Sequence, residues 1–255
     1  MINNHGKNYK IIAIGDIRLQ MADDPRIEKI LAKNYDAIEE IWQKALKEKD
    51  VKLFNGTLPN FIGISSKKEG EIKVTAHFVE YKHFIAQRKQ PDLKLGIKPI
   101  GVSGIIVLKE DDGDYIVFAE RTGNVTEYPG FFELVPAGSI DKEYAGDNGI
   151  IDFQSKLLSE FTEETGLSKN YVKDISGFAF VLDTNHDVYD ICCRILLGVK
   201  KESVVREFLG SKESHRPVFI PVKDLGEFVK ERAAKIVPTS MAMIDAYMRG
   251  GFSGY

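Results

Sequence analysis

Three glutamates, Glu160, Glu163 and Glu164, stand close together in a segment whose pattern predicts a helix over residues 150–165. Successive helical residues turn by about 100°, so with Leu157 at zero the three acids fall at roughly 300°, 240° and 340°. The apolar residues of the segment occupy roughly the arc from 0° to 120°. The acids therefore share one flank of the helix, and Glu164 lies beside its apolar edge.

This arrangement carries two electrostatic penalties. Glu160 and Glu164 form a like-charge pair at i, i+4, which costs ~0.2–0.5 kcal/mol in an isolated helix. All three acids also lie toward the helix C-terminus, where the macrodipole disfavours negative charge, and Lys156, four residues before Glu160, can relieve only one of them. A divalent cation would offset both penalties, and carboxylates without nearby Cys or His favour Mg²⁺ or Mn²⁺ over Zn²⁺. The alternative is an ordinary solvated acidic face.

The patterns on either side of this helix predict a mixed α/β protein. Asp24 and Pro25 begin a helical pattern that reaches about residue 50, and a connector suggests a boundary near residue 97. Gly166 is expected to end the acidic helix in the left-handed conformation, and Thr239 or Ser240 is expected to cap the last helix. The other expected helices are residues 81–88, 225–232 and 239–248. The expected strands are residues 51–54, 61–65, 72–78, 102–109, 115–120, 131–135, 175–182, 188–199 and 218–222.

Composition narrows the possible partners and location. The 255 residues carry 35 basic and 38 acidic side chains, a net charge of -3, whereas nucleic-acid binders usually have a basic excess; we expect no nucleic-acid partner. Adjacent Cys192 and Cys193 in an apolar strand predict reduced core residues, which suits the cytoplasm. No window of 18 apolar residues and no apolar signal region near the N-terminus are evident. We therefore expect a soluble, cytoplasmic protein without membrane contact.

Residues 160–167, Glu-Phe-Thr-Glu-Glu-Thr-Gly-Leu, resemble the second half of the Nudix box, G-x5-E-x7-R-E-U-x-E-E-x-G-U, where U is a bulky aliphatic residue. Residues 132–138 are similar to the strand and turn that lead into the box, and residues 100–250 to the Nudix sandwich. The resemblance implies an α/β/α sandwich with a mixed sheet over residues 98–255, preceded by a smaller α+β domain over residues 1–97. It also implies metal-dependent hydrolysis of a nucleoside diphosphate derivative.

Two departures from the box stand out. The connection from Gly138 to Ser159 is seven residues longer than in the family pattern, and Glu143 matches its first glutamate only loosely. Ser159 also replaces the arginine that orients the metal-binding carboxylates in the family. Lys142 and Arg121 are candidates to supply a cation in its place.

The lengthened box and missing arginine are similar to a Nudix subgroup that cleaves UDP-glucose to UMP and glucose 1-phosphate and carries an extra N-terminal domain. Residues 53–57, 81–84 and 212–215 resemble segments of that subgroup, and Phe54 is expected in the core of the N-terminal domain. This implies UDP-glucose or UDP-galactose as a small-molecule nucleotide substrate. ADP-ribose or another nucleoside diphosphate derivative, a non-catalytic nucleotide-binding module and a purely structural protein stay open. Two roles stay open for the extra domain, which are to complete the substrate pocket and to form a homodimer.

The resemblance assigns the metal ligands to Glu160, Glu163 and Glu164 with the backbone carbonyl of Ala137. Mg²⁺, or Mn²⁺ in its place, would bridge the pyrophosphate oxygens and activate a water for attack on phosphorus.

Residues outside the acidic helix receive the remaining roles. Glu213, in a loop just before a strand, is the candidate general base, although a surface acid is the plainer interpretation. The candidate substrate contacts are Gly138, Arg121 and His215. The alternative for Arg121 is a solvated strand end, and the alternative for His215 is a loop position without contact to substrate.

Overall fold

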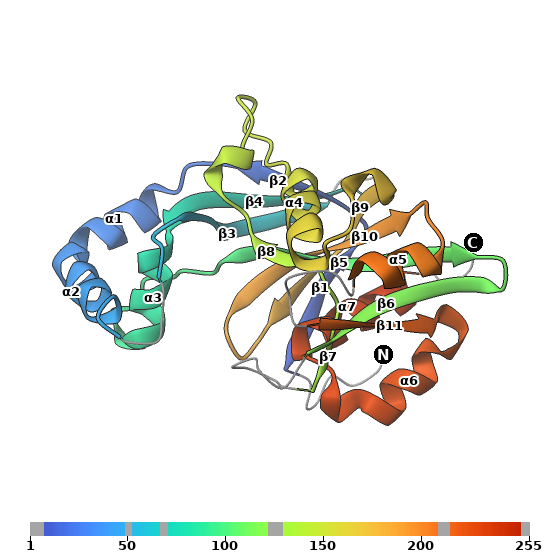
Figure 1. The fold of residues 1–255 in the computed structure, drawn as a ribbon. Helices are drawn as coiled ribbons and strands as arrows, with labels where there is room; N and C mark the ends of the chain where they lie inside the picture. Colours follow the sequence, from blue (N-terminus) through green and yellow to red (C-terminus); the bar gives the residue numbers. More distant parts are fainter. Residues whose placement is uncertain (1–7, 49–52, 67–70, 122–129, 209–214, 251–255) are drawn as a thin grey trace.

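The structure is a computed structural model that describes residues 8–48, 53–66, 71–121, 130–208 and 215–250 (Figure 1). Within these ranges, one large mixed sheet has the strand order β1-β9-β10-β5-β6-β11, with β7 paired to β6 and β8 to β5. The strands are β1 (Tyr9–Ile14), β5 (Ile100–Glu110), β6 (Gly113–Arg121), β7 (Phe132–Glu133), β8 (Ala137–Ser139), β9 (Val172–Asp183), β10 (Val188–Leu197) and β11 (His215–Pro221).

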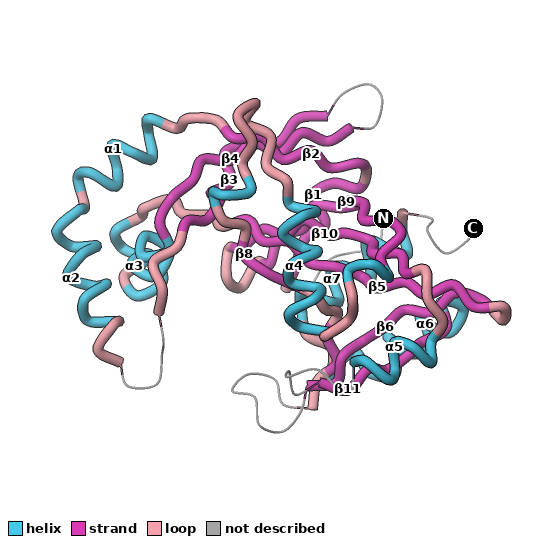
Figure 2. The backbone as a smooth tube through the Cα atoms, turned by 45° about the horizontal axis from the view of Figure 1, so that its top comes forward, coloured by secondary structure: helices cyan, strands magenta, loops and turns pink. Residues whose placement is uncertain are grey.

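Helices cover both faces of this sheet, as the two views show (Figures 1 and 2). On one face, α4 (Phe153–Thr165) and α5 (Lys201–Phe208) bury apolar side chains such as Phe161 against β5 and β10. On the other face, α6 (Leu225–Arg232) and α7 (Pro238–Arg249) contribute Leu225 and Tyr247 to a second core. Residues of β10 alternate between the two cores. The expected α/β sandwich with a mixed sheet is confirmed.

The two cysteines show this alternation directly. Cys193 packs in the core under α4, whereas Cys192 packs in the core under α7. Both are buried free thiols, as the sequence predicted, because neighbouring strand residues point to opposite faces.

A smaller sheet and three helices lie beside the large sheet (Figure 1). Its strands are ordered β2-β4-β3, with bounds β2 (Asp16–Met21), β3 (Thr57–Ser66) and β4 (Glu71–Glu80); the helices are α1 (Pro25–Lys33), α2 (Tyr35–Ala45) and α3 (Tyr81–Lys89). Asp24 caps α1 as predicted, since its side chain accepts from the Arg26 N–H at 3.1 Å. The single long helix predicted to residue 50 is wrong: it divides at Asn34, whose side chain donates to the Ile30 carbonyl oxygen at 2.8 Å.

The small sheet packs against the large one through a shared core. Leu19 of β2 and Val74 of β4 are fully buried in the same cluster as Leu157 and Phe161 of α4. At one end of this core, Phe61 of β3 stacks on Tyr189 of β10, with ring centroids 4.3 Å apart. The small sheet therefore helps to cover the face of the large sheet on which α4 lies.

The predicted domain boundary near residue 97 stays a prediction. Strand β1 precedes it in the sequence but pairs antiparallel with β9 in the large sheet. The chain thus contributes its first described strand to the sheet that residues 98–255 otherwise form.

Several local predictions differ from the structure. Phe54 is 83% exposed rather than in a core, and residues 53–54 form no strand, while residues 51–52 lie outside the described part. The predicted 131–135 strand is limited to Phe132–Glu133. Helix α7 begins at Pro238 after Val237, and Ser240 does not cap it. Instead, the buried Ser240 hydroxyl accepts from the Leu134 N–H at 2.9 Å.

Short 3₁₀ segments complete the fold: η1 (Pro91–Leu93), η2 (Lys142–Tyr144), η3 (Lys169–Tyr171), η4 (Val222–Asp224) and η5 (Ala233–Lys235). None of the helices in the described parts of the chain is both long and apolar enough to cross a membrane.

Candidate functional site

Strand β8 and helix α4 lie side by side (Figure 2), and they bring two of the three predicted acids, Glu160 and Glu164, to Gly138 and Ala137. Strand β8 pairs antiparallel with β5, with Ala137 opposite Ser103 and Gly138 opposite Val102. Helix α4 begins after Asp152, whose side chain accepts from the Ser155 N–H at 3.0 Å. This cap explains why the helix starts later than residue 150. It ends at Gly166, whose φ of 72° confirms the predicted left-handed cap.

Glu160 is wedged against Gly138. A Cβ atom added to Gly138 would lie 2.6 Å from Glu160 Oε1, so any side chain at this position would require Glu160 to move. Its other neighbour is Lys156, whose Nζ lies 2.7 Å from the same oxygen, and the Glu160 side chain is only 17% exposed. The absence of a side chain at Gly138 therefore lets the carboxylate reach the backbone of β8.

Glu164 also contacts β8. Its Oε1 accepts from the Ala137 N–H at 3.3 Å, and the residue is half-buried. Glu160 and Glu164 are one helical turn apart, so both face the strand. The structure thus places two of the predicted acids at the turn that precedes the long connection. The role of the Ala137 carbonyl as a metal ligand stays a prediction.

Glu163 faces a different side of the helix. It is exposed, and it accepts from the Ser159 hydroxyl at 3.0 Å. With Lys169 it lines a shallow groove of about 500 Å³ beside α4. On a helix its side chain is offset by about 100° from that of Glu164, which explains why it does not contact β8 alongside the other two acids.

The donor chemistry fits a hard divalent cation, because Glu160 and Glu164 present carboxylate oxygens beside the backbone of β8. In the conformations that the structure describes, each acid contacts a partner of its own, and among the described residues no three Asp, Glu, His or Cys side chains converge as a metal site. The Lys156 contact is made with Oε1 of Glu160, and a carboxylate has two acceptor oxygens. Cation binding is compatible with these residues provided that Glu163 turns toward β8.

Neither candidate cation from the sequence has a described side-chain contact with the acids. Lys142 is exposed, and its backbone N–H donates to the Thr57 hydroxyl at 2.9 Å. Arg121 ends β6 and is directly opposite His215 of β11 in the register, so the fold brings these two positions side by side. The side chains of Arg121 and His215, and all of Glu213, lie outside the described residues.

Asp190 is a buried acid near this site that the sequence reasoning missed. The residue as a whole is half-buried, but its Oδ1 is out of solvent without a hydrogen-bond partner, while Oδ2 accepts from the Ser103 hydroxyl at 2.6 Å. A Cβ atom on Gly101 would lie 3.5 Å from Asp190 Oδ1 and 3.4 Å from the Gly138 carbonyl oxygen. Burial raises the pKa of Asp190 to about 7, against the hydrogen bond from Ser103. An acid within the apolar 188–199 strand was the available signal.

We expect Asp190→Asn to stabilise the protein more at pH 8 than at pH 5. The folded-state pKa of about 7 lies above the usual 3.8, so between these values the folded protein keeps a proton that the unfolded chain releases. Stability from this group therefore falls as pH rises from about 4 to about 7. Asparagine removes that dependence. Thermal melting of both proteins at the two pH values measures it, and an equal difference in melting temperature at both would contradict it.

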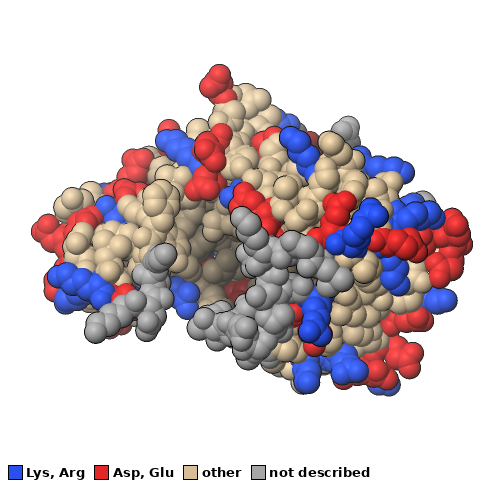
Figure 3. Space-filling model, in the orientation of Figure 1, with Lys and Arg blue, Asp and Glu red and all other residues tan. Residues whose placement is uncertain are grey.

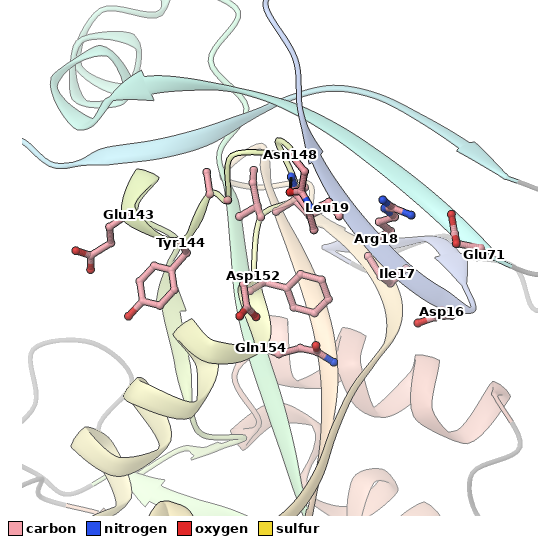
Figure 4. Close-up of a pocket in the computed structure, with 15 residues that line it drawn as sticks. Asp16, Ile17, Arg18, Leu19, Glu71, Glu143, Tyr144, Asn148, Asp152 and Gln154 are labelled. Atoms are coloured by element: carbon pink, nitrogen blue, oxygen red, sulfur yellow. Dashed lines mark hydrogen bonds between the residues drawn. The ribbon is translucent and has the colours of Figure 1, made fainter.

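A second groove, of about 750 Å³, opens at the N-terminal end of α4 (Figure 4). Figure 4 shows Asp16 and Arg18 on β2, and Tyr144 and Asp152 on the segment that leads into α4. Glu143, the loose match to the first box glutamate, lines this groove. Glu160 and Glu164 are not among its lining residues, so it is separate from the acids at β8.

One face of the surface is hollowed and carries charges of both signs (Figure 3). On the face shown in Figure 3 the protein is hollowed beside the part that contains α1–α3, and the described Lys and Arg side chains are interspersed with Asp and Glu. This distribution agrees with the nearly balanced charge of the sequence.

No protein-family model matches the sequence, and no curated protein matches it. Solved structures with a similar fold include Shewanella oneidensis NrtR complexed with a 27mer DNA, at 12% identity and a TM-score of 0.37 over 59% of this chain and 60% of that one. A mutT/nudix family protein from Listeria innocua is 11% identical, with a TM-score of 0.39 over 60% and 93% of the two chains.

A third similar structure is Tm1382, described as a putative Nudix hydrolase, at 10% identity and a TM-score of 0.45 over 78% of this chain and 100% of that one. This chain spans less than two thirds of the length of the DNA-bound NrtR chain. At such identities and with TM-scores below 0.5, these structures assign neither an activity nor a ligand to this protein.

Proposed function

We propose that this protein is a magnesium-dependent hydrolase that splits the pyrophosphate bond of a nucleotide sugar, with UDP-glucose or UDP-galactose yielding UMP and a sugar 1-phosphate. The observation that carries the proposal is the position of Glu160 and Glu164 at β8. Carboxylates beside the backbone of a short strand are suited to hold a cation that a diphosphate can approach.

The proposed roles of the residues at β8 and α4 are metal binding and contact with a phosphate. Glu160, Glu163 and Glu164, with the carbonyl of Ala137, would hold Mg²⁺, which supplies charge neutralisation for the pyrophosphate and acidifies water. Gly138 would present its backbone to a phosphate, while its missing side chain lets Glu160 lie against β8. Positioning and electrostatics carry most of such a reaction.

Three residues near the ends of β6 and β11 complete the proposal. Arg121 and His215, opposite each other in the register, would contact a phosphate of the substrate. Glu213 lies two residues before His215 and would accept a proton from the attacking water.

A non-catalytic nucleotide-binding module is the second candidate. The observation that favours it is the pairing of each acid with a protein partner, above all Glu160 with Lys156. Such a protein would bind a nucleotide without cleaving it.

Turnover of a nucleotide panel tests these functions. UDP-glucose, UDP-galactose, ADP-ribose, NADH and dNTPs are incubated with the protein, with and without Mg²⁺, and products are separated by ion-exchange chromatography. Magnesium-dependent release of UMP from a UDP-sugar is the expected result. Cleavage of ADP-ribose alone would replace the UDP-sugar by another nucleoside diphosphate derivative as the proposed substrate. Nucleotide binding without cleavage of any member would replace the hydrolase with the non-catalytic module.

A further inference from the structure

We propose that Lys156 is a positioning residue that holds Glu160 in place beside Gly138 for cation binding, an inference that rests on the proposed function. Lys156 Nζ lies 2.7 Å from Glu160 Oε1, and the two side chains are only 16% and 17% exposed. On its other side Glu160 meets Gly138, where there is no room for even a Cβ atom. The carboxylate is therefore confined between the ammonium group and the backbone of β8.

The connection between β8 and α4 encloses the lysine. Asp141 Oδ2 lies 3.8 Å from Lys156 Nζ, and the ring of Tyr144 lies 5.8 Å from it, within cation–π range. Two carboxylates and an aromatic ring therefore surround the ammonium group.

This connection is itself tied to the N-terminal part of the chain. The Lys142 N–H donates to the Thr57 hydroxyl at the start of β3, and a Cβ atom on Gly56 would lie 3.3 Å from Asp141 Oδ1. Asp141 and Tyr144 belong to the stretch from Gly138 to Ser159 that exceeds the family spacing. The longer connection thus supplies the contacts that fix Lys156.

Helix geometry places Lys156 and Glu160 one turn apart but gives the pair little stability of its own. A lysine placed four residues before a glutamate is the less favourable order on an isolated helix, and exposed ion pairs are worth little. Ser159, which stands where the family pattern has arginine, donates to Glu163 instead. Among the described residues, Lys156 contacts Glu160 at Oε1, and a carboxylate has a second oxygen that can bind a metal ion.

Lys156→Met and Lys156→Arg, with the full-length protein, test the role. Turnover of the nucleotide panel gives kcat and KM, and electron paramagnetic resonance of free Mn²⁺ gives cation affinity without substrate. Loss of a residue that orients a metal ligand typically costs roughly 10- to 100-fold in affinity or activity. We expect that loss in kcat and in Mn²⁺ affinity for Lys156→Met, with KM nearly unchanged and substantial recovery in Lys156→Arg. The matched control is Lys44→Met, which removes an exposed i, i+4 pair with Glu40.

The outcomes separate this inference from the proposed function. Unchanged Mn²⁺ affinity in Lys156→Met would overturn the positioning role, and so would tighter binding, which would mean that the lysine only competes with the cation. No turnover by the wild type together with weaker Mn²⁺ binding by Lys156→Met would reject the hydrolase and retain the positioning role. No Mn²⁺ binding by the wild type would reject both. Lys156→Gln replaces Lys156→Met if thermal melting shows that the latter does not fold.

Discussion

Replacing Glu164 by glutamine should reduce magnesium-dependent turnover on the order of 100-fold or more, since even residues that merely orient metal ligands are worth roughly 10- to 100-fold. Glutamine has the same size, and its carbonyl oxygen can still accept from the Ala137 N–H that now contacts Glu164 Oε1 at 3.3 Å. The change therefore removes one negative charge beside β8 and little else. The loss is measured as kcat at saturating Mg²⁺ with the substrate that the panel identifies.

The matched control is Glu231→Gln, which neutralises an exposed glutamate of another helix, α6. It should retain wild-type kcat, because surface charges far from a site are largely screened. Thermal melting of Glu164→Gln should give nearly the wild-type transition. Full activity of a folded Glu164→Gln would remove this acid from the metal site and with it the main support for the proposed chemistry.

Replacing Phe180 by alanine should destabilise the protein by about 3–5 kcal/mol, the usual cost of deleting a large buried aromatic side chain. Phe180 is fully buried in β9. Its ring stacks on Tyr189 with centroids 5.2 Å apart and lies 5.6 Å from the ring of Phe61 in β3. It thus stands where the small sheet meets the large one. Such a loss is large beside a total stability of about 5–15 kcal/mol, and urea denaturation measures it.

Phe54→Ala is the control for this change, because Phe54 is 83% exposed. It should alter the free energy of unfolding by no more than about 0.5 kcal/mol. The same experiment bears on the predicted division at residue 97. If both sheets unfold together, Phe180→Ala shifts a single transition. Two wild-type transitions, of which only one responds, would support separate units over residues 1–97 and 98–255.

The sequence by itself determined the features that depend on near neighbours. The acidic helix, its end at Gly166, the cap at Asp24 and the paired strands around residues 102–120 follow from helical and strand periodicity and from local capping. The helical angle also placed Glu164 beside the apolar edge. These properties arise within a few residues, so the chain's local order is enough to predict them.

Only the tertiary structure decided which distant groups meet. Strand β1 pairs with β9, more than 160 residues later, and the burial of the Asp190 carboxyl depends on Ser103 in a neighbouring strand. The sequence offered Lys142 and Arg121 as substitutes for the missing arginine, and Lys156 as able to relieve one acid; the contact that the structure describes for Glu160 is that of Lys156, one helical turn away. Helix spacing relates these two residues, but Gly138, Asp141 and Tyr144, which surround the pair, come from other segments. Their contacts are set by packing between segments that local periodicity does not relate to one another.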